Sequence, residues 1–239
     1  MEIILDNGYS FGAGLFETVK VINKKPMFLE KHLKRLNNSL EVLNINKYIE
    51  RDIIYSYIES EKEENYAIKI MVSDSNTIIT KRPDNYININ RDIGYRISVS
   101  KVLRNSTSLM TYHKTFNYYE NIIEKKKAKE NGFDEVIFLN EKGEVSEGAV
   151  SNIFFIKDNE IYTPKVSSGL LNGTMREYII ENYNVREKDI CQKDLKDFDS
   201  AFISNSLMGI IPVSYIDKIK YSKSEIEDVI ISDLEKLGF

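Results

Sequence analysis

Cysteine, histidine and tryptophan are almost missing from this chain of 239 residues, which has one cysteine, two histidines and no tryptophan. The single cysteine, Cys191, excludes an internal disulfide, and the shortage of cysteine and histidine predicts no metal site. The net charge of -4 at pH 7 gives no excess of basic side chains to attract nucleic acid. No stretch approaches the roughly 18 uninterrupted apolar residues of a membrane helix, and the first residues do not resemble a signal peptide. We therefore expect a soluble cytoplasmic protein without a nucleic-acid or membrane partner.

The residues that are plentiful follow two periodicities. Hydrophobic residues make up 42% of the chain, which is enough for a sizeable core. Leucines recur every three or four residues and predict an amphipathic helix that packs on a sheet: Leu29, Leu33, Leu36, Leu40 and Leu43. Alternating residues predict strands at 15–22, 66–73, 76–82 and 95–102. Helices beside paired strands indicate an α+β protein, with a small N-terminal lobe at 1–104, a connection at 105–112 and a larger lobe at 113–239.

The stretch from His113 to Asn152 contains two side chains with clear chemical potential. Lys114 lies in an apolar and aromatic setting, and a lysine amine that loses its proton can attach covalently to a carbonyl cofactor. Glu147 lies in a turn before an apolar strand, and a carboxylate can pair with a protonated pyridine nitrogen. A predicted helix at 118–132 and a hairpin separate the two residues and can bring both to one cavity. Taken alone, however, Lys114 is not distinguished from the many lysines that lie in solvent.

Three segments resemble the successive signature blocks of the class IV aminotransferases, the fold-type IV pyridoxal 5'-phosphate (PLP) enzymes: KTFNYYENI, EVIFLNEKGEVSEGAVSNIFF and LLNGTMREYII. An earlier segment, FGAGLFET, matches a further block, so the resemblance runs from about Gly8 to Val213. It implies PLP as the cofactor, a small-molecule amine as the substrate, a homodimer, and a mixed, barrel-like sheet with flanking helices in the larger lobe. In one departure, fewer residues precede FGAGLFET than in relatives, which could alter the substrate pocket or the dimer edge.

The resemblance implies a role for each of four side chains. Lys114 is the catalytic residue and the cofactor anchor, and Glu147 keeps the pyridine nitrogen protonated. Arg35, in an HL-x-RL pattern, binds the cofactor phosphate, and Tyr118 donates a hydrogen bond to the phenolic oxygen. The residues alone leave other interpretations open, with Arg35 on a solvated basic helix face and Tyr118 as a core aromatic. His32, in the same pattern as Arg35, is expected to be a structural or surface residue without a catalytic role.

A second set of residues is predicted to hold the phosphate. Thr174, with Glu177 three residues later, predicts a capping box at a helix start, where exposed amides attract phosphate. Capping boxes also open many helices that bind nothing. The resemblance places the phosphate on the backbone amides of Thr174 and Met175 and on the hydroxyl of Ser206. Two residues are expected to contact the substrate: Arg82 and Leu207.

The segment Asn205–Met208 bears on the choice of reaction. Its sequence, NSLM, resembles the pattern of 4-amino-4-deoxychorismate lyases, which eliminate pyruvate to give p-aminobenzoate for folate biosynthesis. Branched-chain transaminases commonly have S-G-T-A in place of residues 204–207, with small residues around the phosphate and the substrate carboxylate, and a Gly-Gly pair after the lysine that is absent here. We therefore expect a lyase. The alternatives are a transaminase that acts on branched-chain or D-amino acids with 2-oxoglutarate or another keto acid, and a non-catalytic relative, against which the retained Lys114 and Glu147 argue.

Overall fold

The computed structural model describes residues 2–87 and 89–239, and the chain divides into two compact units. Unit 1 comprises Met1–Ile87 and His113–Tyr118, and unit 2 comprises Asn88–Tyr112 and Tyr119–Phe239. The predicted boundaries differ from this division at three places, the first being residues 105–112, which were predicted as a connection but belong to unit 2. The strand Tyr95–Arg104 was predicted in the first lobe but belongs to unit 2, because it pairs with two strands of the unit 2 sheet. The segment around Lys114 was predicted in the larger lobe but belongs to unit 1.

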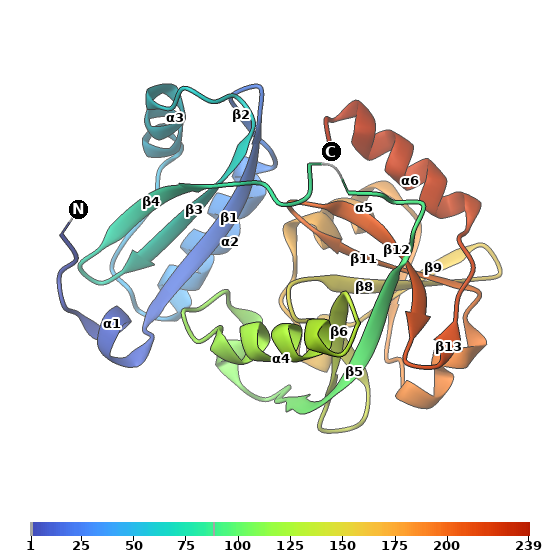
Figure 1. Cartoon of the computed structure of the whole chain (residues 1–239). Coiled ribbons are helices and arrows are strands. Elements are labelled where there is room, and N and C mark those ends of the chain that lie inside the picture. Colours follow the sequence, from blue (N-terminus) through green and yellow to red (C-terminus); the bar gives the residue numbers. More distant parts are fainter. Residues whose placement is uncertain (1, 88) are drawn as a thin grey trace. The chain divides into compact units, whose positions relative to one another are not determined.

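Unit 1 is a small antiparallel sheet in the order β2-β1-β3-β4, and helix α2 packs against β1 (Figure 1). Its strands are β1 (Gly14–Ile22), β2 (Lys25–Pro26), β3 (Tyr66–Ser73) and β4 (Thr77–Arg82). Its helices are α1 (Asn7–Phe11), α2 (Leu29–Val42) and α3 (Arg51–Ser60). The two long strands predicted at 15–22 and 66–73 are confirmed.

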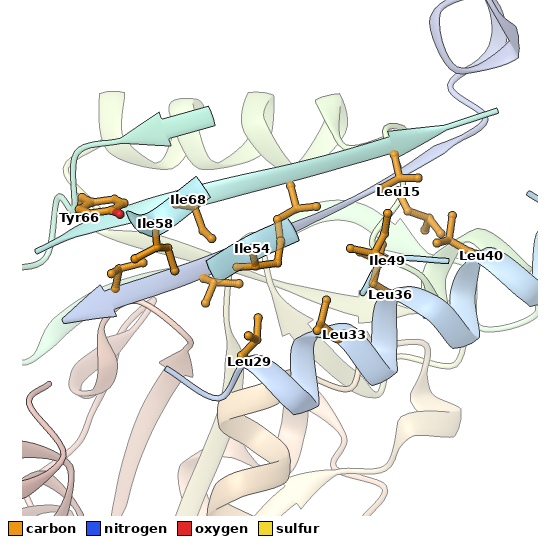
Figure 2. Close-up of a cluster of buried hydrophobic side chains, with 14 of the residues drawn as sticks. Leu15, Leu29, Leu33, Leu36, Leu40, Ile49, Ile54, Ile58, Tyr66 and Ile68 are labelled. Atoms are coloured by element: carbon orange, nitrogen blue, oxygen red, sulfur yellow. The ribbon is translucent and has the colours of Figure 1, made fainter. Parts of the chain in front are cut away.

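The core of unit 1 lies between α2 and one face of the sheet (Figure 2). The leucine spacing correctly predicted the buried stripe of α2: Leu29, Leu33, Leu36 and Leu40. Leu15, Val19 and Val21 of β1 belong to the same cluster. Since successive side chains of a strand point to opposite faces, the odd-numbered residues of β1 face α2 and the even-numbered residues lie on the other face. Phe16 and Glu17, which are both important for the site described below, therefore lie on opposite faces of β1.

The segment His113–Tyr118 runs beside the start of β1. Leu15 and Thr115 form an antiparallel bridge, and the Phe16 amide donates to the Lys114 carbonyl at 2.8 Å. Lys114 is therefore the direct neighbour of Phe16, and the two side chains share one face. A Cβ atom on Gly14 would come within 2.2 Å of the Phe116 ring, so this close approach requires glycine.

Unit 2 is built on a mixed, curled sheet in the order β10-β9-β8-β11-β12-β5-β6-β7, with β13 paired to β12 (Figure 1). Its strands are β5 (Tyr95–Arg104), β6 (Glu135–Asn140), β7 (Val145–Gly148), β8 (Asn152–Lys157), β9 (Glu160–Pro164), β10 (Val185–Lys188), β11 (Ser200–Asn205), β12 (Gly209–Ile216) and β13 (Ile219–Lys220). The parallel pairs are β5 with β6, β5 with β12, and β9 with β10. The predicted α+β class, with a barrel-like mixed sheet in the larger lobe, is confirmed.

Helices flank this sheet. They are α4 (Tyr119–Glu130), α5 (Thr174–Asn182) and α6 (Glu225–Lys236), with short 3-10 helices η1 (Leu109–Tyr112), η2 (Val166–Ser168) and η3 (Gln192–Asp197). One sequence prediction about them was wrong. Helix α5 has no capping box at Thr174, because Gly173 is its N-cap and Thr174 is already helical. Ile122 of α4 is exposed, and the buried residues of that helix are Asn121, Glu124 and Ala128.

No helix in residues 2–87 and 89–239 is long and apolar enough to span a membrane.

Candidate active site

In unit 1, Lys114 lies against two aromatic rings. Its Nζ atom is 4.4 Å from the centre of the Phe16 ring and 4.8 Å from that of Tyr118. The two rings pack edge to face, with centroids 5.1 Å apart. The ladder between β1 and the segment His113–Tyr118 fixes this arrangement. The predicted pair of Lys114 and Tyr118 is thus brought together by a third residue, Phe16, and the half-buried amine lies in a largely apolar setting.

A second lysine, which the sequence analysis did not select, shares the Phe16 ring. The Nζ atom of Lys69 on β3 lies 4.6 Å from the ring centre. In the sheet Lys69 is opposite Thr18, and Arg82 is opposite Ala67, so Lys69, Arg82 and Phe16 project from one face. Burial, with a smaller contribution from the charge of Arg82, lowers the pKa of Lys69. One signal was available in the sequence, because Lys69 interrupts the apolar strand YAIKIMVS.

Arg35 belongs to a buried ionic cluster under the other face of β1. Its Nε and Nη2 atoms donate to the two oxygens of Glu17, each at 2.7 Å. The His32 Nδ1 atom lies 2.7 Å from the same carboxylate. Burial alone would raise the pKa of Glu17, but Arg35 and His32 hold it well below its ordinary value. The guanidinium predicted to bind phosphate is therefore oriented by Glu17, a residue that sequence reasoning passed over.

His32 is the uncharged member of this cluster. Burial lowers its pKa from 6.5, and the positive charges of Arg35 and Lys114 act in the same direction, whereas Glu17 opposes them. The neutral imidazole donates its Nδ1 proton to Glu17. Of the two roles predicted for His32, this position between α2 and β1 agrees with the structural one.

In unit 2, Glu147 on β7 is almost fully buried and accepts the Leu171 amide at 3.0 Å. The Nε atom of Arg104 lies 3.5 Å from its other oxygen, and the Arg104 guanidinium stacks 3.8 Å from the centre of the Phe138 ring. A cation beside the carboxylate favours its charged form. Glu147 is therefore suited to pair with a protonated ring nitrogen, and Arg104 is a second residue that sequence reasoning missed.

The loop after Leu171 leads from Glu147 to the start of α5. Asn152 donates to the Leu171 carbonyl at 2.9 Å, and a Cβ atom on Gly173 would lie only 2.1 Å from the Asn152 side-chain oxygen. Thr174 and Met175 are buried as the first two residues of α5. Gly173 provides no side-chain cap, and the first amides of a helix have no intrahelical acceptor, which suits them to an anion.

The turn between β11 and β12 contains Ser206 and Leu207. The Asn205 side-chain oxygen accepts the amides of Leu207 and Met208, each at 2.9 Å, and its nitrogen donates to the Val150 carbonyl at 3.2 Å. Leu207 is buried and Ser206 is half-buried. The Asn205 side chain therefore stabilises the turn by accepting hydrogen bonds from two backbone amides of the turn.

The predicted residues are distributed over both units. Unit 1 contains four of them: Arg35, Arg82, Lys114 and Tyr118. Unit 2 contains five: Glu147, Thr174, Met175, Ser206 and Leu207. Within unit 1 the structure joins Lys114 to Tyr118, and within unit 2 it joins Glu147 to the loop before α5. In the part of the chain that the structure describes, no group of three or more His, Cys, Asp or Glu side chains could hold a metal ion.

The family model for amino-transferase class IV matches residues 14–216, so the chain belongs to this family of PLP-dependent enzymes. Among curated proteins, an aminodeoxychorismate lyase of Bacillus subtilis is 28% identical over 90% of this chain and 82% of its own length. A probable branched-chain-amino-acid aminotransferase of Rickettsia bellii is 27% identical over 98% of this chain and 89% of its own. Both reactions therefore occur among relatives of similar identity.

Solved structures agree with this assignment. A protein of Legionella pneumophila, provisionally named 4-amino-4-deoxychorismate lyase, matches with a TM-score of 0.90 and 28% identity over 99% of this chain and 95% of that chain. The PLP-bound form of a hypothetical aminotransferase from Mycobacterium tuberculosis matches with a TM-score of 0.81 and 20% identity, over 98% of this chain and 93% of that chain. The chain has the fold of the fold-type IV PLP enzymes.

Proposed function

We propose that this chain binds PLP and eliminates pyruvate from 4-amino-4-deoxychorismate to give p-aminobenzoate, a step of folate biosynthesis. Membership of the class IV family and the likeness to an aminodeoxychorismate lyase of Bacillus subtilis support this proposal. The cofactor, the substrate and the residue roles below are all parts of it.

The side chains present fit PLP. The Lys114 amine lies between two rings in an apolar setting, which suits a residue that must attach to the cofactor carbonyl. Glu147, buried beside Arg104, has the charge that a protonated pyridine nitrogen needs. Phosphate would be held by Arg35, by the amides of Thr174 and Met175, and by the Ser206 hydroxyl. Tyr118 would donate to the phenolic oxygen.

When bound, PLP supplies an electron sink conjugated with the substrate amine. Lys114 then removes the proton from the amine-bearing ring carbon. The bond between the ring and the enol ether oxygen breaks, and the leaving group takes up a proton to become pyruvate. The ring that remains is aromatic, which drives the step. Glu147 would pair with the ring nitrogen and favour its protonated form.

The turn Asn205–Met208 favours this reaction. An α-amino acid carries its carboxylate on the carbon that bears the amine, so a transaminase needs an anion-binding group at that point. In this chain the Leu207 and Met208 amides donate to Asn205 instead. Aminodeoxychorismate carries its carboxylates farther from the amine and needs no anion-binding group beside it. Lys69 and Arg82, on the face of unit 1 that carries Phe16, are the cations that we propose for such a distant carboxylate.

A transaminase is the second candidate, and the likeness to the Rickettsia bellii protein, a probable branched-chain-amino-acid aminotransferase, favours it. In that reaction Lys114 would take up and deliver the proton without loss of a leaving group. The substrates would be branched-chain or D-amino acids with 2-oxoglutarate or another keto acid.

One paired assay separates the two functions. The PLP-loaded protein is given aminodeoxychorismate with no keto acid, and pyruvate and p-aminobenzoate are measured. A parallel reaction contains branched-chain or D-amino acids with 2-oxoglutarate, and Lys114→Ala is the inactive control in both. Equal amounts of pyruvate and p-aminobenzoate without an acceptor would establish the lyase. Amino transfer with no pyruvate release would overturn it in favour of the transaminase.

A further inference from the structure

The first turn of α5 contains a fully buried arginine that none of the roles above uses. Arg176 is 2% exposed and is among the largest fully buried side chains of the residues described. Burial lowers its pKa, although the partner Glu187 acts in the opposite direction. A positive charge near the start of a helix also opposes the helix dipole. An apolar side chain could fill the same buried space without the cost of burying a charge. The hydrogen bonds and the ion pair of this arginine therefore require an explanation.

Arg176 connects three parts of unit 2. Its Nη1 atom donates to the Asn172 side-chain oxygen at 2.8 Å, and its Nη2 atom donates to the Pro164 carbonyl at 3.0 Å. The same Nη2 atom forms an ion pair with Glu187 on β10. The ends of β9 and β10 therefore anchor the guanidinium, and its remaining bond reaches the loop before α5.

That loop, Leu171–Gly173, is held from its other side as well. The Leu171 amide donates to Glu147, and the Leu171 carbonyl accepts from Asn152. Gly173 has no room for a side chain beside Asn152. Three residues of backbone thus link the carboxylate of Glu147 to the first amides of α5, and Arg176 holds the middle residue.

We propose that Arg176 is a positioning residue that acts through Asn172 to fix the loop Leu171–Gly173, and thereby sets Glu147 and the start of α5 relative to each other. The proposal rests on the proposed binding of PLP. The ring nitrogen and the phosphate of PLP lie on one rigid ring system, so the groups that bind them must keep a fixed separation. Because Arg176 is behind the loop, it acts without touching the cofactor.

The test uses Asn172→Ala, since Asn172 is exposed and its replacement removes the side chain that Arg176 holds in the loop. Removal of one charged hydrogen bond is expected to weaken PLP binding to the apoprotein by roughly tenfold, with little change in the melting temperature of the apoprotein. PLP affinity is measured by absorbance titration. In Arg176→Lys a single ammonium group replaces the forked guanidinium and cannot make all of its contacts. This variant should weaken PLP binding by a similar factor and also lower the melting temperature.

Two controls distinguish positioning from a structural role. The double variant should bind PLP no more weakly than Arg176→Lys alone, because both changes interrupt one connection. Arg186→Lys, at an exposed ion pair with Glu160 on the neighbouring strands, should bind PLP as the wild type does. Additive losses, or a loss that follows the melting temperature across the variants, would overturn the proposal.

Hydrogen exchange of the apoprotein keeps this test independent of the proposed function. The Leu171 amide, which donates to Glu147, should exchange faster in Asn172→Ala than in the wild type. Unchanged exchange would overturn the positioning role. If the wild-type protein bound no PLP while exchange still rose in the variant, the proposed function would fail and the control of the loop by Arg176 would stand.

Discussion

Two lysines approach one phenylalanine in unit 1, and their charges bear on substrate recognition. Lys69 and Lys114 lie 4.6 and 4.4 Å from the centre of the Phe16 ring, with Arg82 on the same sheet face. Burial, and to a smaller extent the positive charge of Arg82, lowers the pKa of Lys69, and like charges in a partly buried place repel each other. An anion bound there would relieve this repulsion. The cations of this face thus suit a substrate that carries carboxylate groups.

The first prediction concerns Lys69. Lys69→Met should raise KM for aminodeoxychorismate by roughly 10- to 100-fold, because a charged hydrogen bond contributes about 1.5–3 kcal/mol, and should leave kcat much less affected. Lys25→Met, an exposed lysine of the same unit, is the charge-matched control and should leave KM unchanged. Steady-state kinetics measures both. If KM stayed constant in Lys69→Met, this lysine would have no part in substrate binding.

The second prediction follows from the charge of Arg82 beside Lys69. Lysine binds an anion only when protonated, so KM should rise as the pH increases through the lowered pKa of Lys69. Arg82→Gln removes a neighbouring positive charge and should move this rise to higher pH. A pH profile of KM for the two proteins measures the shift. Coincident profiles would show that Arg82 has no influence on Lys69.

The third prediction concerns the buried cluster of Glu17. Glu17→Gln should lower the free energy of unfolding by roughly 3–5 kcal/mol, because Arg35 and His32 lose a buried partner. The pKa of Glu17 is depressed in the folded state, so its stabilisation is present above the ordinary value of 4.5 and is lost as the pH falls below it. Urea unfolding at pH 7 and pH 4 should therefore show a smaller difference between the two proteins at pH 4. An equal difference would contradict the assigned charge.

Motif residues were predictable from the sequence and their partners were not. Lys114, Tyr118 and Arg35 stand out because they occur in short patterns. The position of Lys69 beside Phe16 depends on the register between β1 and β3, whose residues are far apart in the chain. The pairing of Arg35 with Glu17 likewise depends on how α2 packs on β1. Such contacts are set by tertiary packing, which local patterns do not encode.

At the scale of elements, helix starts show where local signals suffice. Ser224 and Glu227 form a capping box at the start of α6, and the local sequence S-K-S-E-I-E carries this signal. A similar signal at Thr174 failed, because Gly173 is the N-cap of α5 and Thr174 is already helical. Helix α4 shows the same limit, since polar residues occupy its buried face while Ile122 is exposed. The start of α5 and the buried face of α4 therefore depend on contacts with neighbouring elements as well as on the local sequence.

The fourth prediction concerns Glu227 of the α6 capping box. One of its oxygens accepts the Ser224 amide at 2.6 Å, and the residue is fully buried. Burial raises the pKa of Glu227 to about 7, so the folded state holds its proton more tightly than the unfolded state. Stability should therefore fall as the pH rises from about 5 to 8, by roughly 3 kcal/mol at most from this group.

Glu227→Gln tests this relation, because glutamine can still accept the Ser224 amide but carries no charge. The free energy of unfolding is measured by urea denaturation at several pH values between 5 and 8. The variant should lose part of the pH dependence and be the more stable protein at pH 8. If the two curves ran parallel, the carboxyl group would be charged in both states and the raised pKa would be wrong.

For the whole molecule, the division into units could be predicted only in part. Two units of unequal size were expected, but the sequence does not show that His113–Tyr118 returns to unit 1. That return depends on hydrogen bonds between residues about a hundred positions apart, such as the Phe16 amide and the Lys114 carbonyl. The surroundings of Lys114 thus depend on a contact that no local sequence pattern predicts.

The N-terminal segment suggests how the chain assembles. Asp6 accepts hydrogen bonds from Ser73 and from the amide of Ser75, which tie the segment to unit 1. The neighbouring α1 nevertheless leaves Tyr9 and Phe11 each 78% exposed. Large apolar side chains that are both held in place and open to solvent are typical of an interface. We propose that a second copy of this chain covers them in a homodimer.

The fifth prediction is that the protein sediments as a dimer and that replacing both aromatic residues with serine weakens the dimer. Neither Tyr9 nor Phe11 lies in the core, so their replacement should not destabilise the monomer. The double variant should therefore have the same melting temperature as wild-type protein that has been diluted until the dimer dissociates. Tyr48→Ser, another exposed aromatic of unit 1, is the control and should leave the sedimentation unchanged. A monomeric wild-type protein would overturn the homodimer itself. A stable dimer of the double variant would instead place the interface elsewhere, because two buried aromatic side chains contribute several kcal/mol to an interface.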